Sequence, residues 1–146
     1  EKRLDVNVDL LTGRERYPMQ SDLDRLRENL PPDVWQVVKQ AIQNTLERID
    51  QTLAPLEEAN MQRSDGRLIQ DEYRWVAQML RHACWRILWT LGKLGGQEDL
   101  ELRERLVNDV QALSDEHRKL WMARCRAGGF AESVARLEKM REAYLG

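Results

Sequence analysis

The residue types that bind metal ions are few and poorly grouped in this sequence. His82 and Cys84 lie two positions apart, so on a helix they point to different faces, and His117 and Cys125 are eight positions apart. Neither a His-Glu-x-x-His nor a Cys-x-x-Cys motif is present. We therefore predict no metal site and no other cofactor, and we expect His82 to be a hydrogen-bonded residue at a helix junction.

Two pairs of adjacent carboxylates, Asp71-Glu72 and Asp115-Glu116, have the residue types that some glycosidases use for acid–base catalysis. A catalytic acid needs a pocket that raises its pKa, but both pairs lie in helical stretches that are rich in charge. A nucleophile is no better defined, because the sequence has no Gly-x-Ser-x-Gly motif and no histidine at a fixed distance from Cys125, which lies between two arginines. We predict a solvated helix surface at both pairs and no catalytic residue in this chain.

The composition indicates one folded domain. Of the 146 residues, 42% are hydrophobic and 33% are charged, and Lys and Arg number 23 against 25 Asp and Glu. A net charge of −2 does not favour contacts with phosphates, and no apolar run approaches the roughly 18 residues that span a bilayer. We expect no nucleic-acid and no membrane partner, and we favour the cytoplasm, although no targeting signal defines the compartment. With neither a Met start nor a leader peptide, the chain is expected to be a piece of a longer protein.

Hydrophobic spacing predicts an all-α fold. Ser21 begins a short helix that the Pro31-Pro32 pair ends near Leu30. Apolar residues then recur every three or four positions in three long stretches and one shorter stretch, which are 33–56, 69–94, 102–124 and 130–144. Pro55 should kink or end the first of them. The turns and breaks that separate the stretches are Ser64-Asp65-Gly66, Gly95-Gly96 and Gly128-Gly129.

Short links between long helices predict an up-down antiparallel bundle, with three long helices and shorter flanking ones. Residues 21–146 form this bundle domain, and residues 1–20 form an extended arm and link. Within the arm, Leu4, Val6, Val8 and Leu10 alternate with polar residues, as in a half-buried strand. No partner strand is predicted, so this segment either pairs with material outside the chain or is simply extended.

The helix predicted from Tyr73 to Leu94 is apolar around more of its circumference than a simple bundle requires. Its main stripe is accompanied by a second stripe about 100° around the helix. The main stripe contains Ile69, Tyr73, Val76, Leu80, Ala83, Ile87, Leu91 and Leu94, and the second contains Trp75, Met79, His82, Arg86 and Trp89. Such a helix is either the middle rod of the bundle or one that also contacts another domain or subunit. Because Trp is enriched at interfaces, we predict an interface at Trp75, His82, Arg86 and Trp89, with a second patch at Trp121 and Arg124.

The stretch His117–Leu137, together with Leu80–Arg86, resembles the C-terminal helical region of bacterial family 20 glycoside hydrolases, the β-N-acetylhexosaminidases. The usual form in that family is similar to Leu-Trp-Leu-Ala-Arg-Asn-Arg-Pro-Gly-Gly, and this chain has Leu-Trp-Met-Ala-Arg-Cys-Arg-Ala-Gly-Gly. Cys125 and Ala127 stand where the family has Asn and Pro. The likeness covers about 80 residues, Asp65–Tyr144.

The resemblance implies a parent chain with a catalytic (β/α)₈ barrel on the N-terminal side of these helices. In that family an adjacent Asp-Glu pair on a barrel strand acts with the acetamido group of the substrate as nucleophile, and no position here matches that pair. We expect a non-catalytic accessory domain of a hydrolase for terminal N-acetylhexosamines, which packs against the barrel, dimerises the enzyme, or does both. Its partner is then the catalytic domain of the same parent chain or a second copy. The alternative is a self-contained helical interaction or homodimerisation module with no carbohydrate role.

Overall fold

The computed structural model of the chain describes residues 31–125 and 127–145. Within them the fold is all-helical, as predicted, and contains no strand. The helices are α3 (Pro32–Glu57), α4 (Gly66–Leu94), α5 (Leu100–Arg124) and α6 (Phe130–Leu145). The predicted strand at Leu4–Leu10 and the predicted short helix at Ser21–Leu30 lie outside the described residues.

The helix ends follow the turn and cap residues of the sequence. Pro55 lies inside α3, which ends two residues later at Glu57. The N–H of Gly95 donates to the carbonyl of Leu91 at 2.9 Å and so closes the end of α4. The Asp99 side chain then accepts a hydrogen bond from the backbone N–H of Leu102 at 2.9 Å, which caps the start of α5.

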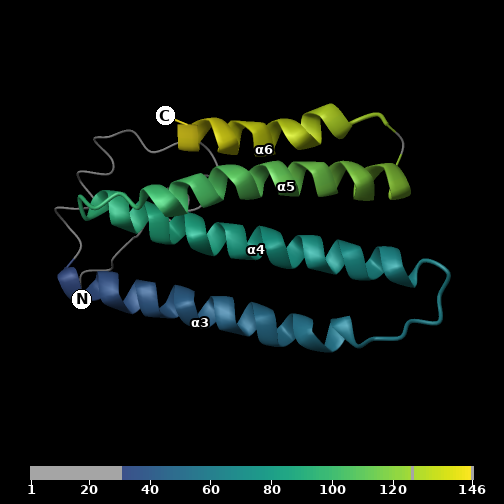
Figure 1. Cartoon of the computed structure of the whole chain (residues 1–146), viewed down its shortest axis with the longest axis horizontal. Helices are drawn as coiled ribbons and strands as arrows, with labels where there is room; N and C mark the ends of the chain where they lie inside the picture. Colours follow the sequence, from purple (N-terminus) through teal and green to yellow (C-terminus); the bar gives the residue numbers. More distant parts are fainter. Residues whose placement is uncertain (1–30, 126, 146) are drawn as a thin grey trace, which may run out of the picture.

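Consecutive helices lie side by side in one row, with α3 against α4, α4 against α5, and α5 against α6 (Figure 1). Within the described part of the chain, α4 therefore has a helical neighbour on both sides, whereas α3 has one neighbour only. None of these helices has the length and apolar character needed to cross a membrane.

The hydrophobic core lies where α4, α5 and α6 meet. It is formed by Trp89 of α4, Leu106 and Val110 of α5, and Leu137 and Tyr144 of α6. No side chain of α3 reaches the same degree of burial among those whose burial is described. The core thus holds α4 firmly from one side, and α3 contributes less to it.

Candidate functional site

The second apolar stripe of α4 faces α5 and α6. Only 2% of His82 and 7% of Trp89 is exposed, and the indole N–H of Trp75 donates to the carbonyl of Leu113 on α5 at 3.0 Å. Arg86 is half-buried. This stripe is therefore occupied by contacts within the chain.

His82 lies at the centre of a buried hydrogen-bond network that joins three helices. Its Nδ1 is 2.6 Å from a carboxylate oxygen of Asp109 on α5, and its Nε2 is 2.9 Å from the hydroxyl of Tyr144 on α6. Because a carboxylate only accepts, Nδ1–H donates to Asp109, and Nε2 is hydrogen-bonded to the Tyr144 hydroxyl, which can donate or accept. Gln78 donates to the other carboxylate oxygen of Asp109. His82 is thus the hydrogen-bonded histidine at a helix junction that the sequence predicts.

A cluster of aromatic rings surrounds His117 at the turn between α5 and α6. The imidazole stacks on Trp75 with ring centres 5.1 Å apart and on Phe130 with ring centres 5.8 Å apart. Trp121 meets the same imidazole edge-on at 5.6 Å. The Nε2 atom of His117 is 2.8 Å from the hydroxyl of Ser133. Burial lowers the pKa of His117 because it disfavours the charged imidazolium.

Arg124 links the end of α5 to the start of α4. Its guanidinium forms two hydrogen bonds with Glu72, at 2.7 and 3.0 Å, and a third with Asp65 at 3.0 Å. The bonds from Arg124 lower the pKa of Glu72, and the pKa of Asp65 is lowered first by its hydrogen bond from Arg63 and then by the bond from Arg124. Cys125, the next residue, is exposed.

Four of the six residues predicted to form an interface, Trp75, His82, Arg86 and Trp89, are on α4, and the other two, Trp121 and Arg124, are in the last turn of α5. His82 and Trp89 are buried and cannot reach a partner while the fold is intact. Trp75, Arg86 and Trp121 are half-buried and Arg124 is exposed, so their role at an interface stays a prediction.

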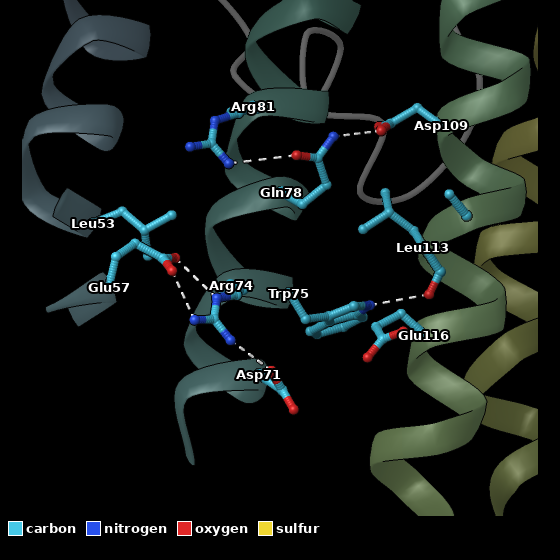
Figure 2. A pocket seen from close by; sticks show the side chains of 11 residues that line it. Leu53, Glu57, Asp71, Arg74, Trp75, Gln78, Arg81, Asp109, Leu113 and Glu116 are labelled. Atoms are coloured by element: carbon cyan, nitrogen blue, oxygen red, sulfur yellow. Dashed lines mark hydrogen bonds and ion pairs between the residues drawn. The ribbon is translucent and has the colours of Figure 1, made fainter. Parts of the chain in front are cut away.

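A polar cleft of about 470 Å³ lies between α3, α4 and α5 (Figure 2). Figure 2 shows Arg74 reaching from α4 to Glu57 on α3, with bonds of 2.7 and 2.8 Å, and also to Asp71 at 2.7 Å. About two turns further along α4, Arg81 binds Asp50 of α3 at 2.6 Å. These ion pairs fix the register of α3 against α4.

The polar groups of this cleft are satisfied by one another. Glu57 has its pKa lowered by the hydrogen bond from Arg74, and the pKa of Arg74 is raised by the same bond. Glu116, which also lines the cleft, pairs with Lys119 of the same helix at 2.7 Å. Across residues 31–125 and 127–145, no three His, Cys, Asp or Glu side chains are grouped so that they could hold a metal ion. The cleft therefore joins helices and leaves no evident group free to bind a ligand.

The main apolar stripe of α4 faces away from α5 and is partly exposed. The exposed fractions are 59% for Tyr73, 48% for Val76 and 52% for Leu80. These side chains line a groove of about 500 Å³ between α3 and α4. We name this surface the α3–α4 face and define it by Thr45, Ile49, Thr52 and Leu56 of α3 and Tyr73, Val76 and Leu80 of α4.

Both apolar stripes of α4 are predicted from the sequence, and the interface predicted on the stripe with Trp75, His82, Arg86 and Trp89 stays a prediction. Spacing alone gives the angle between two stripes and does not say which of them the neighbouring helices cover. One signal was available in the residue types. The polar atoms of Trp and His need hydrogen-bond partners when they are buried, and α5 supplies them to Trp75 and His82, whereas the buried Nε1 of Trp89 has no partner among the described residues.

Comparison of the chain with known protein families, with characterised proteins and with solved structures finds no match. The resemblance of His117–Leu137 to family 20 glycoside hydrolases consequently stays a prediction. In this chain the residues of that segment have defined structural roles, because His117, Trp121 and Phe130 build the aromatic cluster and Arg124 ties α5 to α4.

Proposed function

We propose that this chain is a non-catalytic helical association domain. In full it would be an up-down bundle of three long helices with shorter flanking helices and an extended N-terminal arm. Its surface would join it to the catalytic barrel of a glycoside hydrolase that acts on terminal N-acetylhexosamines, or would join two copies of such an enzyme.

The observation that carries this proposal is the exposed α3–α4 face. Three large apolar side chains, Tyr73, Val76 and Leu80, each expose about half of their surface beside one another. Grouped exposure of this kind marks surfaces that bind other proteins, whereas single exposed apolar residues are common. The glycoside hydrolase assignment is supported by the resemblance alone.

The Asp71-Glu72 pair also supports a non-catalytic role. Asp71 and Glu72 are each bonded to an arginine, Arg74 and Arg124 respectively. The pKa of Glu72 is lowered by its partner, which is the opposite of what a general acid near neutral pH requires. A hydrolytic role would need a carboxyl group that keeps its proton.

The proposal is tested first on the parent protein. The reading frame upstream of Glu1 should encode a (β/α)₈ barrel, and that barrel should lose thermal stability when the helical domain is deleted. Leu80→Glu in the longer protein should have the same destabilising effect, and Met122→Glu on α5, which is similarly exposed, should not. Unchanged melting and activity after the deletion would refute the packing role.

The isolated chain gives a second test. We expect it to release no chromophore from chromogenic N-acetylhexosaminides, and turnover that stays with the chain through purification would contradict a non-catalytic role. The alternative, a self-contained homodimerisation module with no carbohydrate role, is favoured by the same exposed face. A reading frame without a barrel, together with a stable dimer of the chain, would support this alternative.

A further inference from the structure

α3 lies at the edge of the row of helices and is held less firmly than the others. Among the described residues it packs against α4 alone, whereas α4 and α5 each have two neighbours (Figure 1). Each α3 side chain whose burial is described is half-buried or exposed, while α4, α5 and α6 each place side chains in the buried core. Because elements with few buried contacts open locally at a lower free energy than the rest of a fold, α3 is the helix expected to open first.

The hydrogen bonds between α3 and α4 are confined to the C-terminal half of α3 and the residues just after it. Three side chains of α4, Gln70, Arg74 and Arg81, make these bonds, and we name them the latch. The amide of Gln70 donates to two backbone carbonyls at 3.1 and 2.7 Å, and both guanidinium groups bond to carboxylates. The partners are Asp50, Leu56, Glu57 and Ala59. Between residues 33 and 49, by contrast, the side-chain hydrogen bonds of the described structure stay within α3 itself.

The N-terminal end of α3 is also less covered by α4. The two ion pairs of the latch set α3 antiparallel to α4, and this register places residue 37 level with Leu94, the last residue of α4. Residues 32–36 therefore extend beyond the end of α4. A groove of about 770 Å³ lies between this end of α3, the end of α4 and the turn that leads to α5, and Trp35 and Lys39 line it on the α3 side.

The backbone of α3 alone favours the opposite order of opening. Pro55 lies in the latched half of the helix and has no N–H, so one helical hydrogen bond is missing there. Residues 37–46 contain neither proline nor glycine. A helix held only by its own hydrogen bonds would therefore weaken first near Pro55. The order in which the two halves open consequently distinguishes the effect of the latch from intrinsic helix strength.

We infer that α3 is a strap over α4 that opens from its N-terminal end while the latch holds its C-terminal half in place. Opening as far as residue 46 leaves both ion pairs intact and uncovers Leu88 and Leu91, the apolar side chains of α4 that line the groove. Elements that rearrange when partners bind are drawn from the parts of a fold that open at low free energy. The inference goes beyond the proposed association role and is independent of it, because it concerns the chain alone.

Hydrogen exchange of the backbone amides of the full chain, followed by NMR, gives the first test. Relative to their intrinsic rates, we expect the amides of residues 37–46 to exchange at least about 10-fold faster than those of residues 50–57, because opening the second half also breaks the bonds of the latch. The amides beside the buried core of α4, α5 and α6 should be slower than both. Measurement at two protein concentrations shows whether association of the chain contributes to the protection.

Removal of one latch residue gives the second test. Arg74→Gln should accelerate exchange at residues 50–57 by a factor of about 2–5, the usual worth of an exposed ion pair, and should leave residues 37–46 unchanged. Arg124→Gln is the matched control, because Arg124 is similarly exposed and also bonds to two carboxylates, but it joins α5 to α4. This variant should leave the exchange of both halves of α3 as it is.

Three results would overturn the inference. The first is equal protection of the two halves of α3, the second is faster exchange near Pro55 than at residues 37–46, and the third is equal acceleration of both halves by Arg74→Gln, which would show that α3 opens as one unit. None of these results depends on a catalytic barrel or on what binds the α3–α4 face, so failure of this inference is distinguishable from failure of the proposed function.

Discussion

Replacing Tyr144 with phenylalanine removes a hydroxyl from the buried network that joins α4, α5 and α6. The ring of Tyr144 meets Trp89 edge-on with centres 5.4 Å apart, and a phenyl ring keeps that contact. What the substitution removes is the hydroxyl, which lies 2.9 Å from Nε2 of His82. The imidazole is then left in the core without the partner that this hydroxyl provides.

The expected cost follows from burial. A typical hydrogen bond contributes about 0.5–1.5 kcal/mol net, and a buried polar atom left without a partner costs about 1–3 kcal/mol. We therefore expect Tyr144→Phe to lower the free energy of unfolding by about 1–3 kcal/mol. In a domain of this size that corresponds to a decrease in Tm of about 2–4 °C for each kcal/mol.

Urea and thermal unfolding followed by circular dichroism measure this effect. Tyr73→Phe is the matched control, because the same hydroxyl is removed from an exposed side chain and should change stability by no more than about 0.5 kcal/mol. Both variants are compared at a protein concentration where the oligomeric state is constant. Equal stabilities for the two variants would show that the His82–Tyr144 contact does not hold α6 in place.

Three further substitutions test other contacts. Burial lowers the pKa of His117 below its unfolded value of about 6.5, so the unfolded state binds the extra proton first and the free energy of unfolding should fall as the pH drops from about 7 towards the folded pKa. His117→Gln should flatten this part of the curve of stability against pH, and an unchanged slope would exclude His117 as its source. Gly129 has a φ of +84°, whereas Gly128 is not in the left-handed region. Urea unfolding should therefore show that Gly129→Ala lowers the free energy of unfolding by about 1–2 kcal/mol and that Gly128→Ala lowers it much less, and equal losses would argue against strain at this turn. Arg124→Gln should lower the Tm slightly in dilute buffer and negligibly in 1 M NaCl, because the ion pair with Glu72 is open to solvent and is screened by salt. A decrease in Tm that does not depend on salt would indicate lost packing instead.

The positions of the helices in the described part of the chain could be predicted because they depend on local chemistry. Gly95 and Gly129 mark helix boundaries where the spacing of apolar residues breaks, and Asp99 is a suitable cap for the helix that follows. Each of these effects acts within a few residues along the chain. The all-helical class therefore follows from the sequence.

The orientation of α4 could not be predicted in the same way, because it depends on residues far away in the sequence. Asp109 lies 27 positions from His82, and Tyr144 lies 62 positions from it. Spacing identifies an apolar stripe, but it contains no information about which distant groups will lie opposite. The ion pairs of Arg74 and Arg81 with α3 depend on distant residues in the same way.

The chemical difference between the two stripes of α4 explains why one is inside and the other is exposed. Trp75 and His82 have polar atoms that must be paired once they leave water, and the carbonyl of Leu113 and the carboxylate of Asp109 pair them. Such bonds are directional, so they fix how α4 lies against α5. Val76 and Leu80 have no polar side-chain atom and can be covered by any apolar surface of suitable shape. A stripe that makes specific bonds is therefore suited to building the domain itself, and a stripe whose exposed side chains are mainly aliphatic is suited to a partner that arrives after the domain has folded.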